Sequence, residues 1–149
     1  VKGHLKDVLK SFDAAIEALT VAQANGQEEN AAKLLSQVYL KKAQAASKAK
    51  DYNGAIELCL KSNEYVESAN AYRVAAGAAQ KLGNNADTIK YYEKYLELSP
   101  KAKDFGGVAY TIAVLYQQEG NNAKAKEFYE KIVNDPQYGA AAKEFISKN

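Results

Sequence analysis

Three short segments of this chain repeat one pattern at intervals of 33 and 37 residues. They are centred on Lys50, Gly83 and Gly120, and each lies between two stretches whose apolar residues have helical spacing. Gly readily takes the left-handed backbone conformation that ends a helix. In the second and third segments Gly is followed by Asn-Asn, and an Asn side chain accepts a hydrogen bond from the free N–H groups that begin a helix. The pattern therefore predicts helix–turn–helix pairs.

The rest of the chain supports an all-α fold. No segment shows sustained alternation of apolar and polar residues, and only two prolines occur. Regular apolar spacing at intervals of three and four residues is typical of amphipathic helices. A helix pair of this kind leaves one face uncovered until another pair stacks on it, so about three pairs are needed for stability.

These segments resemble the tetratricopeptide repeat, a helix–turn–helix of about 34 residues, over residues 31–136. The resemblance is carried by small side chains that let paired helices approach, aromatic side chains that fill the space between pairs, and turn residues: Tyr39, Ala43 and Ala55; Tyr72, Ala76, Gly83, Tyr92 and Pro100; Ile112, Ala113, Tyr116, Gly120, Ala125 and Tyr129. The sequence departs from the family pattern where Lys50 replaces Gly, Cys59 replaces an aromatic residue, Thr88 replaces Ala, and Pro136 comes one residue early.

The resemblance implies a solenoid of antiparallel helix pairs that follows a right-handed superhelix. We expect a single domain over residues 1–149 that comprises an N-terminal helix from a partial repeat, three repeats and a C-terminal capping helix: 1–25, 31–68, 69–103, 104–136 and 137–149. The first helix is expected to be unbroken up to Asn25-Gly26, because no breaker interrupts its apolar spacing; a split near Lys10-Ser11 is the alternative.

Composition argues against several functional classes. Twenty basic and 18 acidic residues give a net charge of +2, and Arg73 is the only Arg, so a phosphate-binding face is not expected. With one His (His4) and one Cys (Cys59), neither a disulfide nor a zinc site can be assembled. The chain lacks a run of 18 apolar residues, so we expect no membrane insertion. We predict no enzyme activity, no cofactor and no metal. Gly106-Gly107 is interpreted as a hinge or a loose connection, since no phosphate-loop motif surrounds it.

In the family that this chain resembles, the first helices of successive repeats line a concave groove that binds polypeptides. By position, the groove would be lined by polar, cationic and aromatic side chains: Gln37, Lys41, Gln44, Lys48, Asn70, Arg73, Gln80, Tyr110, Val114 and Gln117, with Leu40, Val74, Gly77 and Thr111 beside them. Tyr110 and Arg73 are the expected anchors, because Tyr and Arg dominate interface hot spots. A merely solvated face is the alternative interpretation.

The charge of these positions suggests the chemistry of a partner. Lys41, Lys48, Arg73 and Lys81 make the N-terminal part of the groove mildly basic, which favours acidic or polar segments. Some family members grip the C-terminal carboxylate of chaperones with Lys, Asn and Arg. The matching positions here are Leu40, Gln44, Val74, Gly107 and Thr111, so chaperone-tail binding is not expected.

The sequence thus predicts a non-catalytic scaffold that binds a protein or peptide, and neither nucleic acid nor a membrane interior. Two alternatives remain: an assembly subunit that forms a homo-oligomer through the exposed N-terminal helix, and a regulatory module of a larger protein. The chain contains no Met and is rich in Lys but nearly free of Arg. That composition leans towards a processed bacterial extracytoplasmic (periplasmic) protein, with a cytoplasmic one as the alternative.

Overall fold

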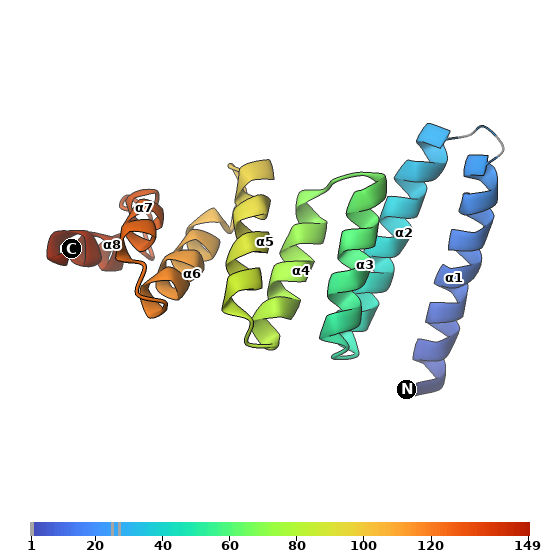
Figure 1. Cartoon of the computed structure of the whole chain (residues 1–149), viewed down its shortest axis with the longest axis horizontal. Coiled ribbons are helices and arrows are strands. Elements are labelled where there is room, and N and C mark those ends of the chain that lie inside the picture. Colours follow the sequence, from blue (N-terminus) through green and yellow to red (C-terminus); the bar gives the residue numbers. More distant parts are fainter. Residues whose placement is uncertain (1, 25, 27) are drawn as a thin grey trace. The chain divides into compact units, whose positions relative to one another are not determined.

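The computed structural model describes residues 2–24, 26 and 28–149, and for residues 2–6 it describes the backbone alone. Within these ranges the chain forms eight α-helices and no strand (Figure 1), which confirms the all-α prediction. The helices are α1 (Lys2–Ala24), α2 (Glu28–Lys48), α3 (Tyr52–Tyr65), α4 (Ala69–Lys81), α5 (Asn85–Leu98), α6 (Phe105–Gln118), α7 (Asn122–Glu130) and α8 (Gly139–Lys148).

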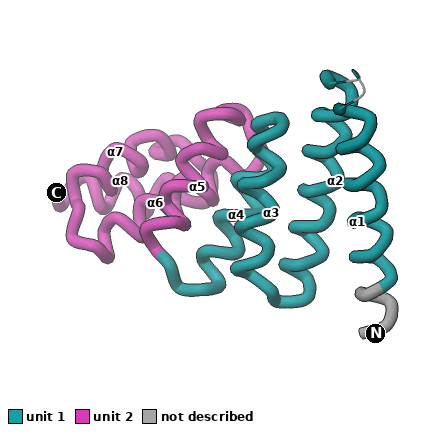
Figure 2. The backbone as a smooth tube through the Cα atoms, turned by 45° about the vertical axis from the view of Figure 1, so that its right-hand side comes forward, with its two compact units in different colours: residues 1–84 teal, residues 85–149 magenta. Residues whose placement is uncertain are grey.

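The chain is divided into two compact units, residues 1–84 and 85–149 (Figure 2). Unit 1 holds α1 to α4 and unit 2 holds α5 to α8. The boundary falls inside the Gly-Asn-Asn turn that follows α4. The predicted division of a single domain into three repeats stays a prediction.

In unit 1, consecutive helices run in opposite directions and pack side by side (Figure 1). Helix α1 is unbroken, as its apolar spacing predicts, and it packs on α2. A salt bridge of 2.6 Å between Lys42 and Asp13 joins these two helices. The contact between α2, α3 and α4 consists largely of small side chains, and Ala46, Ala55 and Ala78 form one buried cluster.

A buried polar link fixes α2 against α3. The Ser62 hydroxyl donates to the carbonyl of Ser36 at 2.7 Å, and the Ser36 hydroxyl donates to the carbonyl of Val66 at 3.1 Å. Both serines are buried. Buried hydroxyl groups destabilise a fold unless they are paired, and here the pairing is available only in the observed register of the two helices.

In unit 2, α6 packs against α5 and α7, and α8 packs on α7. The buried ring of Phe145 in α8 lies 4.6 Å from the ring of Tyr129 in α7, measured between centroids. Tyr116 in α6 stacks on Phe128 in α7 at 5.9 Å. Helix α8 therefore covers the end of this unit, as expected of a capping helix.

The three repeated turns share one geometry. Their central residues all take the left-handed conformation, with φ of 65° at Lys50, 74° at Gly83 and 79° at Gly120. In each turn the residue that follows donates its N–H to a carbonyl five residues back: Asp51 to Ala46, Asn84 to Ala79, and Asn121 to Tyr116, at 2.9, 3.0 and 2.9 Å. Lys50 thus occupies the turn position that is glycine in the second and third turns.

The side chain after the central residue then caps the next helix in the first and third turns. The Asp51 carboxylate accepts the N–H of Gly54 at 3.0 Å, and the Asn121 side chain accepts the N–H of Lys124 at 3.2 Å. These bonds satisfy donors that have no partner within the helix.

Gly106-Gly107 has a packing role. A Cβ on Gly106 would collide with the carboxylate of Asp135, and one on Gly107 would lie 3.5 Å from the Tyr138 hydroxyl. Asp135 itself accepts the backbone N–H groups of Gln137 and Tyr138 at 2.8 and 2.9 Å. The glycine pair therefore lets the connection between α7 and α8 approach the start of α6.

The turn geometry predicts opposite effects of two substitutions. Gly120→Ala should destabilise the protein by about 1 kcal/mol, because a side chain in the left-handed conformation is strained. A Cβ at Gly120 meets no atom within 4 Å, so the effect comes from the backbone alone. Lys50→Gly should stabilise the protein by up to about 1 kcal/mol, since it removes the same strain. Urea unfolding followed by circular dichroism measures both, and equal stability of all three proteins would contradict the assignment.

Candidate partner-binding face

Seven of the ten predicted groove residues lie in unit 1, on α2 and α4. Gln37, Lys41, Gln44 and Lys48 are all exposed and recur at intervals of four, three and four residues, so they share one side of α2. On α4 the predicted residues Asn70, Arg73 and Gln80 are likewise exposed. Because α2 and α4 contact each other directly, we treat these seven residues as one surface, the α2/α4 face.

The α2/α4 face is positively charged. Helix α2 has no acidic residue after Glu29, and α4 has none at all. Lys41 and Lys48 form no ion pair with any described residue, in contrast to the neighbouring Lys42, which pairs with Asp13. The face therefore carries two ammonium groups together with the guanidinium group of Arg73, and its other members are the amide side chains of Gln and Asn.

Gly77 lies between Arg73 and Gln80 on α4 and leaves the helix backbone uncovered. A Cβ at this position would have no atom within 4 Å, so no packing within the protein requires Gly here. Gly inside a helix destabilises it by about 1 kcal/mol relative to Ala. None of the described residues makes a packing contact that would explain why this destabilising Gly is present.

The other three predicted residues, Tyr110, Val114 and Gln117, lie on one side of α6 in unit 2. The Tyr110 ring stacks on Tyr138 at 4.7 Å, and the Gln117 side chain accepts the hydroxyl proton of Tyr129 at 2.9 Å. Two of the three therefore already help to hold α7 and the connection to α8. Tyr110, an expected anchor, is half-buried in this stack.

Among the described residues we find neither a candidate metal site nor a candidate membrane-spanning helix. Within the described side chains, no three His, Cys, Asp or Glu residues are grouped so that they could hold a metal ion. The side chain of His4 lies outside the described residues. Across the described part of the chain, none of the helices is both long and apolar enough to cross a membrane.

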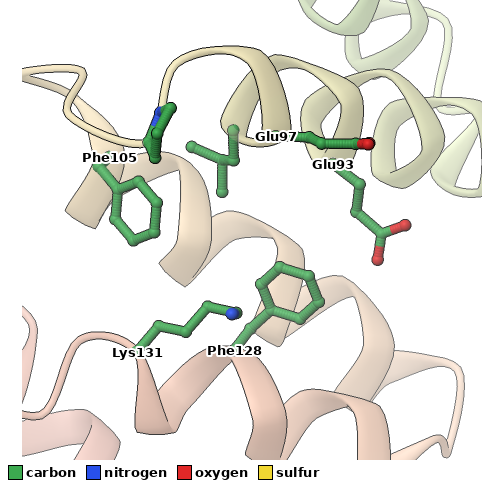
Figure 3. Close-up of a pocket in the computed structure, with 7 residues that line it drawn as sticks. Glu93, Glu97, Phe105, Phe128 and Lys131 are labelled. Carbon is green, nitrogen blue, oxygen red and sulfur yellow. The ribbon is translucent and has the colours of Figure 1, made fainter.

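Unit 2 contains a cleft that the sequence did not predict (Figure 3). It has a volume of about 430 Å³ and is lined by side chains from α5, α6, α7 and the turns after α5 and α7: Glu93, Leu96, Glu97, Pro100, Phe105, Phe128 and Lys131. Neither Phe105 nor Phe128 is among the residues that carry the resemblance in the sequence. The aromatic character of these two positions was the available signal, and sequence spacing alone does not bring them together.

Comparison with known proteins agrees with the fold. The model of the tetratricopeptide repeat family matches residues 69–102 and 107–134. These two segments therefore are tetratricopeptide repeats, and the resemblance inferred from the sequence is confirmed there. The first predicted repeat, residues 31–68, lies outside both matches.

Solved structures show the same fold at low sequence identity. The crystal structure of MamA protein is 22% identical, with a TM-score of 0.59 over 98% of this chain and 75% of that one. PilF of Pseudomonas aeruginosa is 16% identical, with a TM-score of 0.57 over 92% of this chain and 72% of that one. A search of curated proteins finds no match. The predicted fold class, a tetratricopeptide-type solenoid of helix pairs, is confirmed.

The buried thiol of Cys59 gives a prediction about reactivity. Its side chain is fully buried, and burial raises the pKa of the thiol to about 12. Because the thiolate is the reactive form, native protein at pH 8 should react with Ellman's reagent at least 100-fold more slowly than protein in 6 M guanidinium chloride. A native thiol that reacts as fast as the unfolded one would contradict the burial.

Since the pKa of the Cys59 thiol is raised in the folded state, this group should lower the free energy of unfolding progressively as the pH rises above 9.

Proposed function

We propose that this protein is a non-catalytic scaffold whose α2/α4 face binds an extended, acidic polypeptide segment. Tetratricopeptide repeats are generally protein–protein interaction modules. The observation that carries the finer proposal is the pair of lysines, Lys41 and Lys48, on a face without acidic residues.

The spacing of these lysines suits an extended chain. Seven residues of α-helix span about 10 Å, and three residues of extended chain span the same distance. Two acidic side chains three residues apart in a partner would therefore reach both ammonium groups. Gln37 and Gln44 provide amide groups that hydrogen-bond a peptide backbone, and Gly77 leaves room for it to lie close to α4.

Charge reversal on this face tests the proposal. The probe is a fluorescein-labelled decapeptide of Ser, Ala and Tyr with Glu at its fourth and seventh positions. We expect the double variant Lys41→Glu and Lys48→Glu to bind it at least tenfold more weakly than the unaltered protein at 20 mM salt, measured by fluorescence anisotropy. Exposed ion pairs contribute about 0.2–1 kcal/mol each, and reversal adds repulsion to their loss.

The matched control is the double variant Lys90→Glu and Lys94→Glu. It makes the same charge change on two exposed residues of α5 and should bind the peptide nearly as well as the unaltered protein. Equal weakening by both double variants would show a general charge effect and overturn the proposal. So would equal binding of a peptide with Lys in place of both Glu residues.

A second candidate function, assembly through α1, is favoured by one surface. Ala14, Ala18 and Val21 are exposed and follow each other at intervals of four and three residues along α1. Val21 is 57% exposed. A strip of exposed apolar side chains along one helix is typical of a surface that another helix covers, and the candidate partner is a second copy of this chain.

If α1 mediates assembly, the double variant Ala18→Glu and Val21→Glu should be monomeric where the unaltered protein is a dimer at 50 µM. Both positions are exposed, so the fold should be preserved. Light scattering measures the mass, with Ala123→Glu and Ala140→Glu as the control, since these residues are also exposed. A monomeric unaltered protein at every concentration would rule this function out.

A further inference from the structure

We propose that the cleft of unit 2 is a second docking site, for a partner segment that presents a bulky apolar side chain beside a Lys or Arg. The cleft is distinct from the predicted groove. None of Tyr110, Val114 and Gln117 lines it, and α6 contributes only its first residue, Phe105.

The interior of the cleft is apolar. The rings of Phe105 and Phe128 lie on opposite sides of it (Figure 3), and the buried Leu96 and Pro100 also line it. Both Phe side chains are only half-buried, so the cleft leaves aromatic surface in water. Its volume of about 430 Å³ is within the range of about 300–1,000 Å³ that is usual for ligand sites. Such a space accommodates a Leu, Met or Phe side chain.

The charge at the edge of the cleft determines which residue of the partner fits beside its apolar side chain. Glu93 and Glu97 stand one helical turn apart on α5, on one edge of the cleft. The Tyr116 hydroxyl donates to Glu93 at 2.7 Å and holds its carboxylate in position. Burial and this bond raise the pKa of Tyr116, so the hydroxyl stays a donor at any physiological pH.

Glu97 is available to a partner. Its side chain is 69% exposed, and its ion pair with Lys94 is long, at 3.7 Å. Exposed pairs of this kind contribute little to stability, so a guanidinium or ammonium group from outside readily replaces Lys94. Two carboxylates on one edge therefore favour a basic residue.

Lys131 does not cancel this preference. It lines the cleft from the position directly after α7, and its ammonium group lies 5.8 Å from the centre of the Phe128 ring. A cation over an aromatic face is stabilised there. The described residues give it no ion pair with Glu93 or Glu97, so the acidic edge keeps its charge.

The proposal is tested with a defined peptide and the full chain. The probe is an acetylated, amidated octapeptide of Gly and Ser that carries one Leu and, two positions later, one Arg. In a ¹⁵N NMR titration we expect it to shift the amide signals of residues 93–97, 105 and 128–131. The same peptide with Glu for Arg, or with Ser for Leu, should bind at least fivefold more weakly.

Two variants locate the binding. Glu97→Lys should weaken binding of the Arg peptide at least fivefold, and it alters an exposed side chain, so folding is preserved. Glu130→Lys is the matched control, because Glu130 is exposed on α7 and does not line the cleft; it should have little effect. Phe128→Ala should also weaken binding, with circular dichroism to verify the fold.

Three outcomes would overturn the proposal. The first is the absence of shifts at the cleft with 5 mM peptide, and the second is equal weakening by Glu97→Lys and Glu130→Lys. The third is a concentration-dependent shift of the same amides without peptide, which would show that a second copy fills the cleft. Binding that survives Lys41→Glu and Lys48→Glu would show that this site acts independently of the α2/α4 face.

Discussion

The close approach of paired helices is the constraint on which the rest of the structure depends. It is possible because the contact positions carry almost no side chain: Ala43, Ala55, Ala75, Ala109 and Ala125 are fully buried. A larger residue at such a position would push the helices apart and displace every aromatic ring packed beside them. Protein interiors are close-packed and tolerate little change in volume. The stacks between Tyr39 and Tyr65 and between Tyr116 and Phe128 join helices of such closely packed pairs, α2 with α3 and α6 with α7.

Local physics explains why so much of the fold was predictable. Helical spacing and the three left-handed turns act over fewer than ten residues, so the sequence contains all that specifies them. Lys50 illustrates this local effect, because it takes the left-handed conformation at φ 65° although it is not glycine. Gly106-Gly107 was harder to interpret. Its role depends on Asp135 and Tyr138, which lie about thirty residues away along the chain.

The binding residues divide in the same way. Exposure of Gln37, Lys41, Gln44 and Lys48 follows from helical periodicity and the burial of the opposite side of α2. The stack of Tyr110 on Tyr138 does not, since it depends on the path of the connection after α7. The cleft was beyond reach for the same reason, because Glu93, Phe105 and Phe128 come from three separate helices. Sequence patterns thus identify which side of a helix faces outward, but they do not identify which residues from different helices line a cleft.

The burial of Cys59 has a practical consequence. Cys59 is the only thiol in the chain. Because it is buried and stays protonated, it should not react with maleimide dyes under native conditions. A single cysteine introduced at Gln44 or Glu130 would then carry a fluorophore at one chosen place, with no need to remove the native residue. Native Cys59 would give no background labelling, so a dye at either introduced cysteine would monitor ligand binding at its own surface.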